Sequence, residues 1–238
     1  MAVIMIRIDK FLSEMGIGTR TEVKKYIRQG IISVDGETIK KPELKIDETK
    51  QKICMNGKEI HYEQFEYYML HKPSGVVSAT SDKKEKTVID LITGEKRKDL
   101  FPVGRLDKDT EGLLLITNDG EMAHRLLSPK KHVDKTYYAK VAGRVTDHEK
   151  ELFWHGMYIG NDEYAKPSEL KIIKEDEISE IELTIQEGKF HQVKRMFQAV
   201  GMEVVYLKRM SMGALKLDPD LQKGEYRKLT AEEVESLC

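Results

Sequence analysis

The segment 104–120, with the sequence GRLDKDTEGLLLITNDG, joins a charged loop to a short aliphatic run and a turn. The loop carries Asp107 and Asp109, and the aliphatic run covers residues 113–116. A short apolar run bounded by turn signals is typical of a buried strand, and residues 118–120 (Asn-Asp-Gly) have the chemistry of a turn that ends it. The segment therefore predicts two carboxylates at one end of a sheet, facing a groove. An ordinary solvated loop has the same composition, so the surrounding chain has to decide.

The composition describes a soluble globular protein. The chain has 238 residues, of which 39% are apolar and 34% are charged, which allows one large domain or two smaller ones. The formal net charge of −1 gives no nucleic-acid signal, so any such signal has to come from local clustering. Cys54 and Cys238 lie far apart, which indicates a reducing cytoplasm and no disulfide framework. No apolar run approaches about 18 residues, so neither a signal peptide nor a membrane span is expected.

The first part of the chain predicts two short helices and a hairpin. Apolar residues recur at helical spacing over residues 8–15. A capping box at 19–22 (Thr-Arg-Thr-Glu) starts a second helix, which ends at Gly30. A hairpin follows over residues 32–39, with its turn at Asp35-Gly36. The second helix has a basic face, and a solvated surface without any partner would show the same charges.

Three motifs of this first module resemble the S4 RNA-binding fold in order and spacing. They are Arg7-Ile8-Asp9-Lys10-Phe11-Leu12, the helix start Thr19-Arg20, and Ile32-Ser33-Val34-Asp35-Gly36. The resemblance implies that the basic second helix and the loop before it contact RNA phosphates. The residues expected to bind RNA are Arg7, Lys10, Arg20, Lys24, Lys25 and Arg28.

A new apolar run begins at Phe65, which places a domain boundary near residue 63 and predicts domains 1–62 and 63–238. Pro73 and Gly75 break what would otherwise be one long strand at its start. Further strands are expected at 135–141, 170–173, 181–185, 204–208 and 214–217, and helices at 121–127, 193–200 and 232–237, with a short helical face at 88–92. Many strands at hairpin-like spacing with few helices predict an α+β domain whose mixed sheet is mostly antiparallel.

Most standard catalytic signatures are missing from the sequence. It has no His-Glu-x-x-His, no spacing for a zinc site, no phosphate-binding or dinucleotide-binding glycine loop and no Gly-x-Ser-x-Gly. Three features remain as candidates for a site. They are a carboxylate loop, an aromatic strand at Tyr137-Tyr138, and a basic turn with Lys189, Lys194 and Arg195. An ionised carboxylate beside a cation, with a ring for stacking, would suit chemistry on a flipped-out base. A solvated loop, a core aromatic residue and a solvated helical turn would fit the same residues.

Four motifs resemble those of the pseudouridine synthases, in the order of that superfamily. They are Leu70-His71-Lys72-Pro73-x-Gly75, Gly104-Arg105-Leu106-Asp107 with Thr110-x-Gly112-Leu113-Leu114-Leu115, Lys135-Thr136-Tyr137, and Glu187-Gly188-Lys189-x-His191-Gln192-Val193-Lys194-Arg195-Met196. Together with the S4-like module, the resemblance covers nearly the whole chain. Residues 191–197 and 224–230 are most similar to the branch that modifies small-subunit ribosomal RNA.

The resemblance implies a role for each motif residue. Asp107 would be the nucleophile that attacks the target uridine, either at C1′ of the sugar or on the base. Tyr137 would stack on the flipped base, and its hydroxyl is a candidate for removing the C5 proton. Arg105 would hold the target out of its helix by contacting a phosphate. The reaction moves no group to another molecule and changes no oxidation state, so no cofactor and no metal are expected.

Two adjacent residues are candidates for the cation that pairs with Asp107. Lys194 is expected to pair with Asp107, but many relatives carry arginine at this position, and Arg195 is the alternative. Leu115 is expected in the apolar floor of the pocket. Asp109 lacks any support from the motif and is interpreted as a loop residue.

The expected partner is ribosomal RNA, with 16S rRNA in a small-subunit assembly intermediate as the substrate of a cytoplasmic monomer that has no membrane contact. Two alternatives stay open. One is a pseudouridine synthase for 23S rRNA in the large subunit, and the other is a ribosome assembly factor without catalytic activity.

Overall fold

The computed structural model describes residues 5–60, 64–93, 97–128 and 131–237. The chain divides into two compact units at Glu66 and Tyr67. The first unit also takes in Ile92–Leu100, which returns to it from later in the chain. This return was absent from the domains expected from the sequence, because it depends on packing between segments far apart in the chain. The second unit contains Tyr67–Leu91 and the chain from Phe101 onward.

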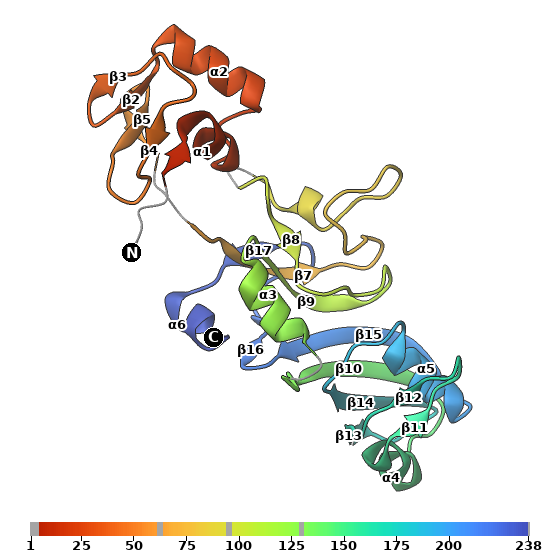
Figure 1. Cartoon of the computed structure of the whole chain (residues 1–238). Helices are drawn as coiled ribbons and strands as arrows, with labels where there is room; N and C mark the ends of the chain where they lie inside the picture. The colour runs from red at the N-terminus through yellow and green to blue at the C-terminus, as the bar shows by residue number, and fades with distance from the viewer. Residues whose placement is uncertain (1–4, 61–63, 94–96, 129–130, 238) are drawn as a thin grey trace. The chain divides into compact units, whose positions relative to one another are not determined.

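The first unit combines two helices with short strands, as the sequence predicted (Figure 1). The helices are α1 (Ile8–Glu14) and α2 (Arg20–Gln29). A four-stranded sheet has the order β3 (Glu37–Thr38), β2 (Ile32–Val34), β5 (Ile53–Met55) and β6 (Lys58–Glu59), and β1 (Ile6–Arg7) pairs with β4 (Lys45–Ile46). The core residues shared by these elements are Ile8, Phe11, Leu12, Val23, Ile27, Ile32, Val34, Ile46 and Ile53.

Both ends of α2 follow from local chemistry. The Thr19 hydroxyl accepts a hydrogen bond from the Glu22 amide at 3.3 Å, and the Glu22 carboxylate accepts one from the Thr19 amide at 2.7 Å. This reciprocal pair satisfies two amides that a helix start leaves without partners. Gly30 ends the helix in the left-handed conformation, with φ of 74°. The capping box and the terminal glycine predicted from the sequence are confirmed.

The second unit is built on a nine-stranded sheet (Figure 1). Its main path runs β13 (Glu169–Lys174), β14 (Ile178–Ile185), β10 (Lys135–Ala142), β15 (Glu203–Met212), β9 (Glu111–Thr117), β7 (Tyr67–Lys72) and β17 (Tyr226–Lys228), while β16 (Leu215–Lys216) pairs with β15 and β8 (Phe101–Pro102) with β9. Where the structure describes this sheet, β15 and β9 run parallel and the other neighbours are antiparallel. The predicted α+β class with a mixed, mostly antiparallel sheet is confirmed.

The helices of the second unit include one that the sequence did not lead us to expect. They are α3 (Gly120–Leu127), α4 (Asp147–His155), α5 (Gln192–Ala199) and α6 (Ala231–Glu235), with a 3₁₀ turn at Ile89–Leu91 and a small hairpin of β11 (Met157–Tyr158) and β12 (Tyr164–Ala165). The missed helix is α4, although Thr146 and Glu149 form a capping box at its start. Asp119 also does more than end a strand, because its carboxylate accepts from the Met122 amide and starts α3.

Strand β9 lies in the middle of the unit, and all seven of its residues are buried. Its two faces serve different layers because successive side chains of a strand point to opposite sides. Leu113 and Leu115 pack with Met69, Val103 and Met122. The loop that carries Asp107 and Asp109 therefore enters a strand that cannot shift without breaking this core.

Candidate active site

The loop between β8 and β9 is fixed by hydrogen bonds from two other segments. The Ser78 hydroxyl donates to the carbonyl of Leu106 at 2.8 Å and accepts from the amide of the same residue at 3.1 Å. The amide of Gly75 donates to the carbonyl of Lys108 at 2.8 Å. Asp107 thus sits in a loop that is bonded on both sides of it.

Lys72 reaches the same loop from the end of β7. Its Nζ donates to the carbonyls of Pro73 at 3.0 Å, Lys108 at 3.2 Å and Thr110 at 2.8 Å, and the side chain is fully buried. Burial lowers the pKa of Lys72 to about 8, although the charges of Asp109 and Asp107 oppose this shift. Lys72 therefore fixes the backbone on either side of Asp109 through hydrogen bonds to the carbonyls of Lys108 and Thr110.

Asp107 faces the start of helix α5. The Lys194 Nζ lies 3.3 Å from Oδ2 of Asp107, and Nε2 of His191 lies 3.6 Å from Oδ1. The same Lys194 Nζ lies 2.6 Å from Oδ1 of Asp109. One ammonium therefore bridges two carboxylates, and Asp109 belongs to this cluster rather than to an unattached loop.

The pKa shifts in the cluster favour its charged state. The hydrogen bond from Lys194, together with its charge, holds the pKa of Asp109 below the usual value against partial burial. Burial disfavours the ammonium of Lys194, but the hydrogen bond to Asp109 and the charges of both aspartates outweigh it and raise the pKa of Lys194. A lasting positive charge beside Asp107 is the consequence.

The turn before α5 is held by the buried carboxylate of Glu187. Its Oε1 accepts from Nε2 of Gln192 at 2.8 Å and from the amide of Lys166 at 2.8 Å, and its Oε2 accepts from Nζ of Lys189 at 2.8 Å. His191 closes the turn with φ of 49°, a left-handed conformation uncommon for a residue other than glycine. This network fixes the direction in which His191 and Lys194 leave the backbone.

A small cleft opens beside Asp107. Its walls include Arg105, Tyr137 of β10, Ile185 of β14, Val193 of α5 and Leu207 of β15. Tyr137 is 7% exposed, and its hydroxyl makes no hydrogen bond with the residues that the structure describes. The cleft thus combines a carboxylate, an aromatic ring and apolar side chains.

Arg105 and Arg195 have different surroundings, although both were predicted to contact substrate. Arg105 is exposed, and its guanidinium has no ion-pair partner within the described parts of the chain. Arg195 pairs with Glu163 and donates to the carbonyls of Ile159 at 3.0 Å and Gly160 at 2.6 Å. Of the two cations considered for Asp107, the structure therefore places Lys194 beside it and ties Arg195 to the β11–β12 hairpin.

The expectation that Leu115 forms the floor of the pocket is wrong. Leu115 is 1% exposed and belongs to the core between β9 and α3. The physical reason is the alternation of β9, which turns position 115 toward the same layer as Leu113. The apolar wall of the cleft comes instead from Ile185, Val193 and Leu207.

Sequence patterns had given no role to three residues that the structure brings to the loop. Lys72 and His191 stand inside the motifs, so their positions in those motifs were the available signal. Asp109 could not be recognised, because its contact with Lys194 joins residues 85 positions apart.

The six basic residues predicted to bind RNA separate into two groups in the first unit. Arg7 pairs with Asp9 at 2.8 Å, and Lys10 lies 3.6 Å from Glu14. On α2, Lys24 is half-buried and interacts with the charge of Asp9. Arg20, Lys25 and Arg28 are exposed and have no ion pair with a described residue. Among the six residues, the three that have no ion pair with a described residue therefore all lie on α2.

Comparison with known proteins identifies both units. Residues 66–199 match the model of the RNA pseudouridylate synthase family, and residues 6–58 match the S4 domain. The chain belongs to the RNA pseudouridine synthases. The predicted enzyme class, an isomerase with an N-terminal S4 domain, is confirmed.

Relatives of this pseudouridine synthase match it over nearly the full length. An uncharacterized RNA pseudouridine synthase of Bacillus subtilis is 48% identical to this chain. The match covers 98% of this chain and 98% of the relative. The ribosomal small subunit pseudouridine synthase A of Vibrio cholerae is 41% identical, covering 98% of this chain and 99% of its own. A crystal structure of a pseudouridylate synthase superposes with a TM-score of 0.69 at 37% identity, covering 98% of this chain and all of its own.

Neither a metal cluster nor a membrane-spanning helix occurs in the described part of this pseudouridine synthase. Within residues 5–60, 64–93, 97–128 and 131–237, no group of three or more His, Cys, Asp or Glu side chains could hold a metal ion. Over the same residues, no helix has the length and apolar character needed to cross a membrane.

Proposed function

We propose that this enzyme converts a uridine of small-subunit (16S) rRNA to pseudouridine, with Asp107 as the nucleophile on a flipped-out uridine. The observation that carries the proposal is the contact of 3.3 Å between Asp107 and Lys194 beside a cleft lined by Tyr137. The choice of the small subunit is supported by full-length relatives with that name, 41% identical in Vibrio cholerae and 38% identical in Escherichia coli.

The proposed reaction rearranges bonds within one nucleoside. The Asp107 carboxylate attacks either C1′ of the ribose or the uracil ring, and the bond between N1 and C1′ breaks. The uracil then turns in the cleft, C5 bonds to C1′, the bond to Asp107 breaks so that the carboxylate is restored, the C5 proton leaves and N1 gains a proton. Atoms and oxidation states balance without a second substrate, so the proposal needs no cofactor.

Each cleft residue has a physical reason for its proposed role. Lys194 keeps a positive charge 3.3 Å from the carboxylate of Asp107, which holds the proposed nucleophile in place. The Tyr137 ring offers a stacking surface for an unpaired base, worth about 1–3 kcal/mol. The exposed guanidinium of Arg105 lacks an ion-pair partner among the described residues and is available for an RNA phosphate.

The test of the nucleophile is Asp107→Asn, with Asp109→Asn as the matched control. Both changes remove one carboxylate from the Lys194 cluster. We expect Asp107→Asn to form no detectable pseudouridine and still bind the RNA, while Asp109→Asn keeps activity because Asp107 remains. The measurement is pseudouridine formation on 16S rRNA in single turnover. An Asp107→Asn protein that is active and free of wild-type enzyme would show that the proposed chemistry is wrong.

The substrate is tested separately by mapping pseudouridine in both ribosomal RNAs of a deletion strain. We expect one 16S position to lose the modification and regain it on complementation. Loss at a 23S position would assign the enzyme to the large subunit. Loss at neither position, together with no turnover of assembly intermediates, would favour an assembly factor without activity. We further propose that the enzyme acts in the cytoplasm, as a monomer, on a small-subunit assembly intermediate.

A further inference from the structure

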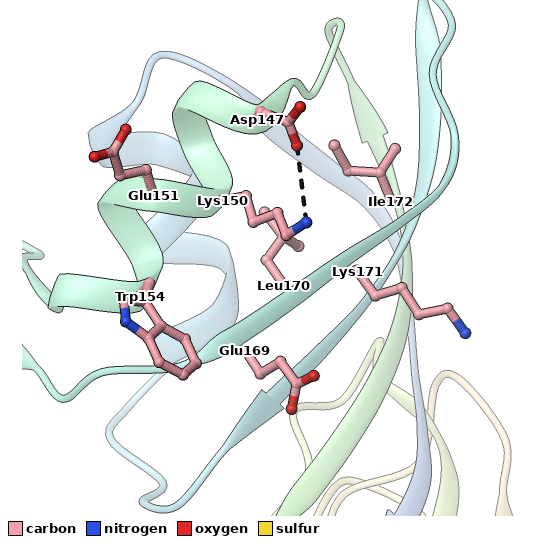
Figure 2. Close-up of a pocket in the computed structure, with 8 residues that line it drawn as sticks. All are labelled: Asp147, Lys150, Glu151, Trp154, Glu169, Leu170, Lys171 and Ile172. Carbon is pink, nitrogen blue, oxygen red and sulfur yellow. Dashed lines mark ion pairs between the residues drawn. The ribbon is translucent and has the colours of Figure 1, made fainter.

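A groove of about 580 Å³ lies between helix α4 and strand β13 in the second unit (Figure 2). Helix residues including Lys150, Glu151 and Trp154 form one wall, and residues 169–172 form the other. The groove shares no lining residue with the cleft at Asp107. Its volume falls within the range of about 300–1,000 Å³ that is usual for binding sites. It is therefore a candidate site that catalysis leaves unused.

The strand wall of the groove is an edge of the sheet. Strand β13 is the terminal strand of the main path and pairs with β14 on one side. Residues 169–172 line the groove without a gap. Since neighbouring side chains of a strand point to opposite faces, a groove that touches four consecutive residues follows the strand's edge. An open edge offers backbone amides and carbonyls to an added strand.

The helix wall is anchored at Ser168, the residue directly before this strand. The carbonyl of Phe153, in the last turn of α4, accepts from the amide of Ser168 at 2.9 Å and from its hydroxyl at 3.2 Å. Trp154 follows Phe153 directly and is 63% exposed, and Figure 2 shows its ring beside Glu169. Tryptophan is enriched at binding hot spots. An indole this exposed, next to an open strand edge, provides a stacking face for a bound chain.

The charges in the groove favour a positively charged partner. Both of its lysines already pair with carboxylates, Lys150 with Asp147 at 3.8 Å and Lys171 with Glu182 at 3.5 Å. Glu151 and Glu169 have no ion pair with any residue that the structure describes. Two uncompensated carboxylates repel RNA phosphates and attract a cation. A cation held by Glu169 can also lie over the ring of Trp154.

We propose that this groove docks an extended basic segment of a partner protein. The segment pairs with the open edge of β13 as an additional strand and places an arginine or lysine side chain near Trp154 and Glu169. The proposal is independent of which RNA the enzyme modifies.

The test uses the single tryptophan of the sequence, because the fluorescence of Trp154 then reports on this groove alone. The probe is a synthetic peptide of alternating Arg and Val, titrated into the full-length protein. We expect a saturable shift of the emission that weakens with added salt. A peptide with Glu in place of Arg should give no shift. Proline at alternate positions should weaken binding, because proline cannot donate to a strand.

Two double variants of equal charge change separate the groove from the rest of the surface. Glu151→Gln with Glu169→Gln should weaken peptide binding at least about 10-fold, which corresponds to about 1.4 kcal/mol. Glu121→Gln with Glu235→Gln removes two exposed carboxylates elsewhere and should leave the affinity unchanged. Both pairs keep Trp154 and Asp107, so fluorescence and pseudouridine formation report on folding.

Three outcomes would overturn the proposal. One is equal peptide affinity of the wild-type protein and the groove variant. Another is a uridine-rich RNA oligonucleotide that shifts the Trp154 emission and loses this effect in the groove variant. The third is a doubled mass in solution that Trp154→Ala abolishes, which would make the groove a contact between two copies of this chain.

Discussion

Lys194 is the cation that the structure places beside Asp107. It stands in the first turn of α5 and neutralises Asp107 and Asp109 together. Its hydrogen bond and its charge hold the pKa of Asp109 below the usual value. The compact ammonium of lysine can serve both oxygens at once, whereas the fork of arginine would favour a bidentate pair with one carboxylate.

The buried Lys72 makes stability depend on pH. Its pKa falls to about 8 from the ordinary value of 10.5. Between these values the unfolded chain binds more protons at this site than the folded chain, so the free energy of unfolding rises with pH. We expect the wild-type protein to gain stability relative to Lys72→Met from pH 8 to 10.5, by at most about 1.4 kcal/mol per pH unit.

The measurement for Lys72 is denaturant unfolding at several pH values, followed by the fluorescence of Trp154 in the same unit. Subtracting the free energy of unfolding of Lys72→Met from that of the wild-type protein removes the contribution of all other titrating groups. A difference that stays constant across this pH window would mean that Lys72 keeps its ordinary pKa in the folded protein.

At the scale of elements, the parallel contact between β15 and β9 requires a glycine. Gly112 has φ of 103°, and a Cβ at this position would lie 2.2 Å from the carbonyl oxygen of Arg209. Gly112→Ala should lower the free energy of unfolding by about 3 kcal/mol or more, because the backbone conformation is unfavourable for alanine and the strands must separate. Thermal unfolding followed through Trp154 would measure this loss.

Gly120→Ala is the matched control for Gly112. It stands in the first turn of α3, and an added Cβ would meet no atom within 4 Å. Its effect should stay within about 0.5 kcal/mol. Equal effects of the two substitutions would show that the close approach to Arg209 is not what Gly112 provides.

Local sequence patterns were sufficient to predict most helices and strands, but not which distant segments pair with one another. The ends of α2, the hairpin turn at Asp35-Gly36 and the strand expected at 135–141 all depend on neighbouring residues, and the structure confirms them. The pairing of β9 with β15 joins segments about 97 positions apart, as Lys208 with Glu111, and periodicity contains no information about it. The side of β9 on which Leu115 lies had the same limitation, since alternation alone does not say which layer covers which face.

The candidate site shows the same division between local and distant information. The motifs gave the positions of Asp107 and Tyr137, which the structure brings to one cleft, and of Lys194, which contacts Asp107 beside it. They could not separate Lys194 from Arg195, because two adjacent residues of a first helical turn differ only in direction. That direction follows from contacts of Arg195 with Glu163 and the carbonyls of Ile159 and Gly160.

At the scale of the whole molecule, the basic face of α2 predicts that RNA binding can be weakened without a change in the chemical step. Arg20, Lys25 and Arg28 carry exposed charge without an ion pair among the described residues, and none of them lines the cleft. We expect their joint replacement by glutamine to weaken RNA binding and to leave the rate at saturating RNA unchanged. The slope of log affinity against log salt should fall by about 0.7–0.9 for each phosphate that the protein no longer neutralises.

The control for α2 removes the same charge from the same unit. Lys40, Lys41 and Lys58 are exposed and lie outside α2, so their joint replacement by glutamine should change the affinity and its salt slope less than the α2 variant does. Filter binding at several salt concentrations gives both quantities, and single-turnover pseudouridine formation gives the rate. Equal losses of affinity in the two variants would mean that the unit attracts RNA through its total charge and that α2 has no special part in binding. A lower rate at saturating RNA would instead connect α2 to the chemical step.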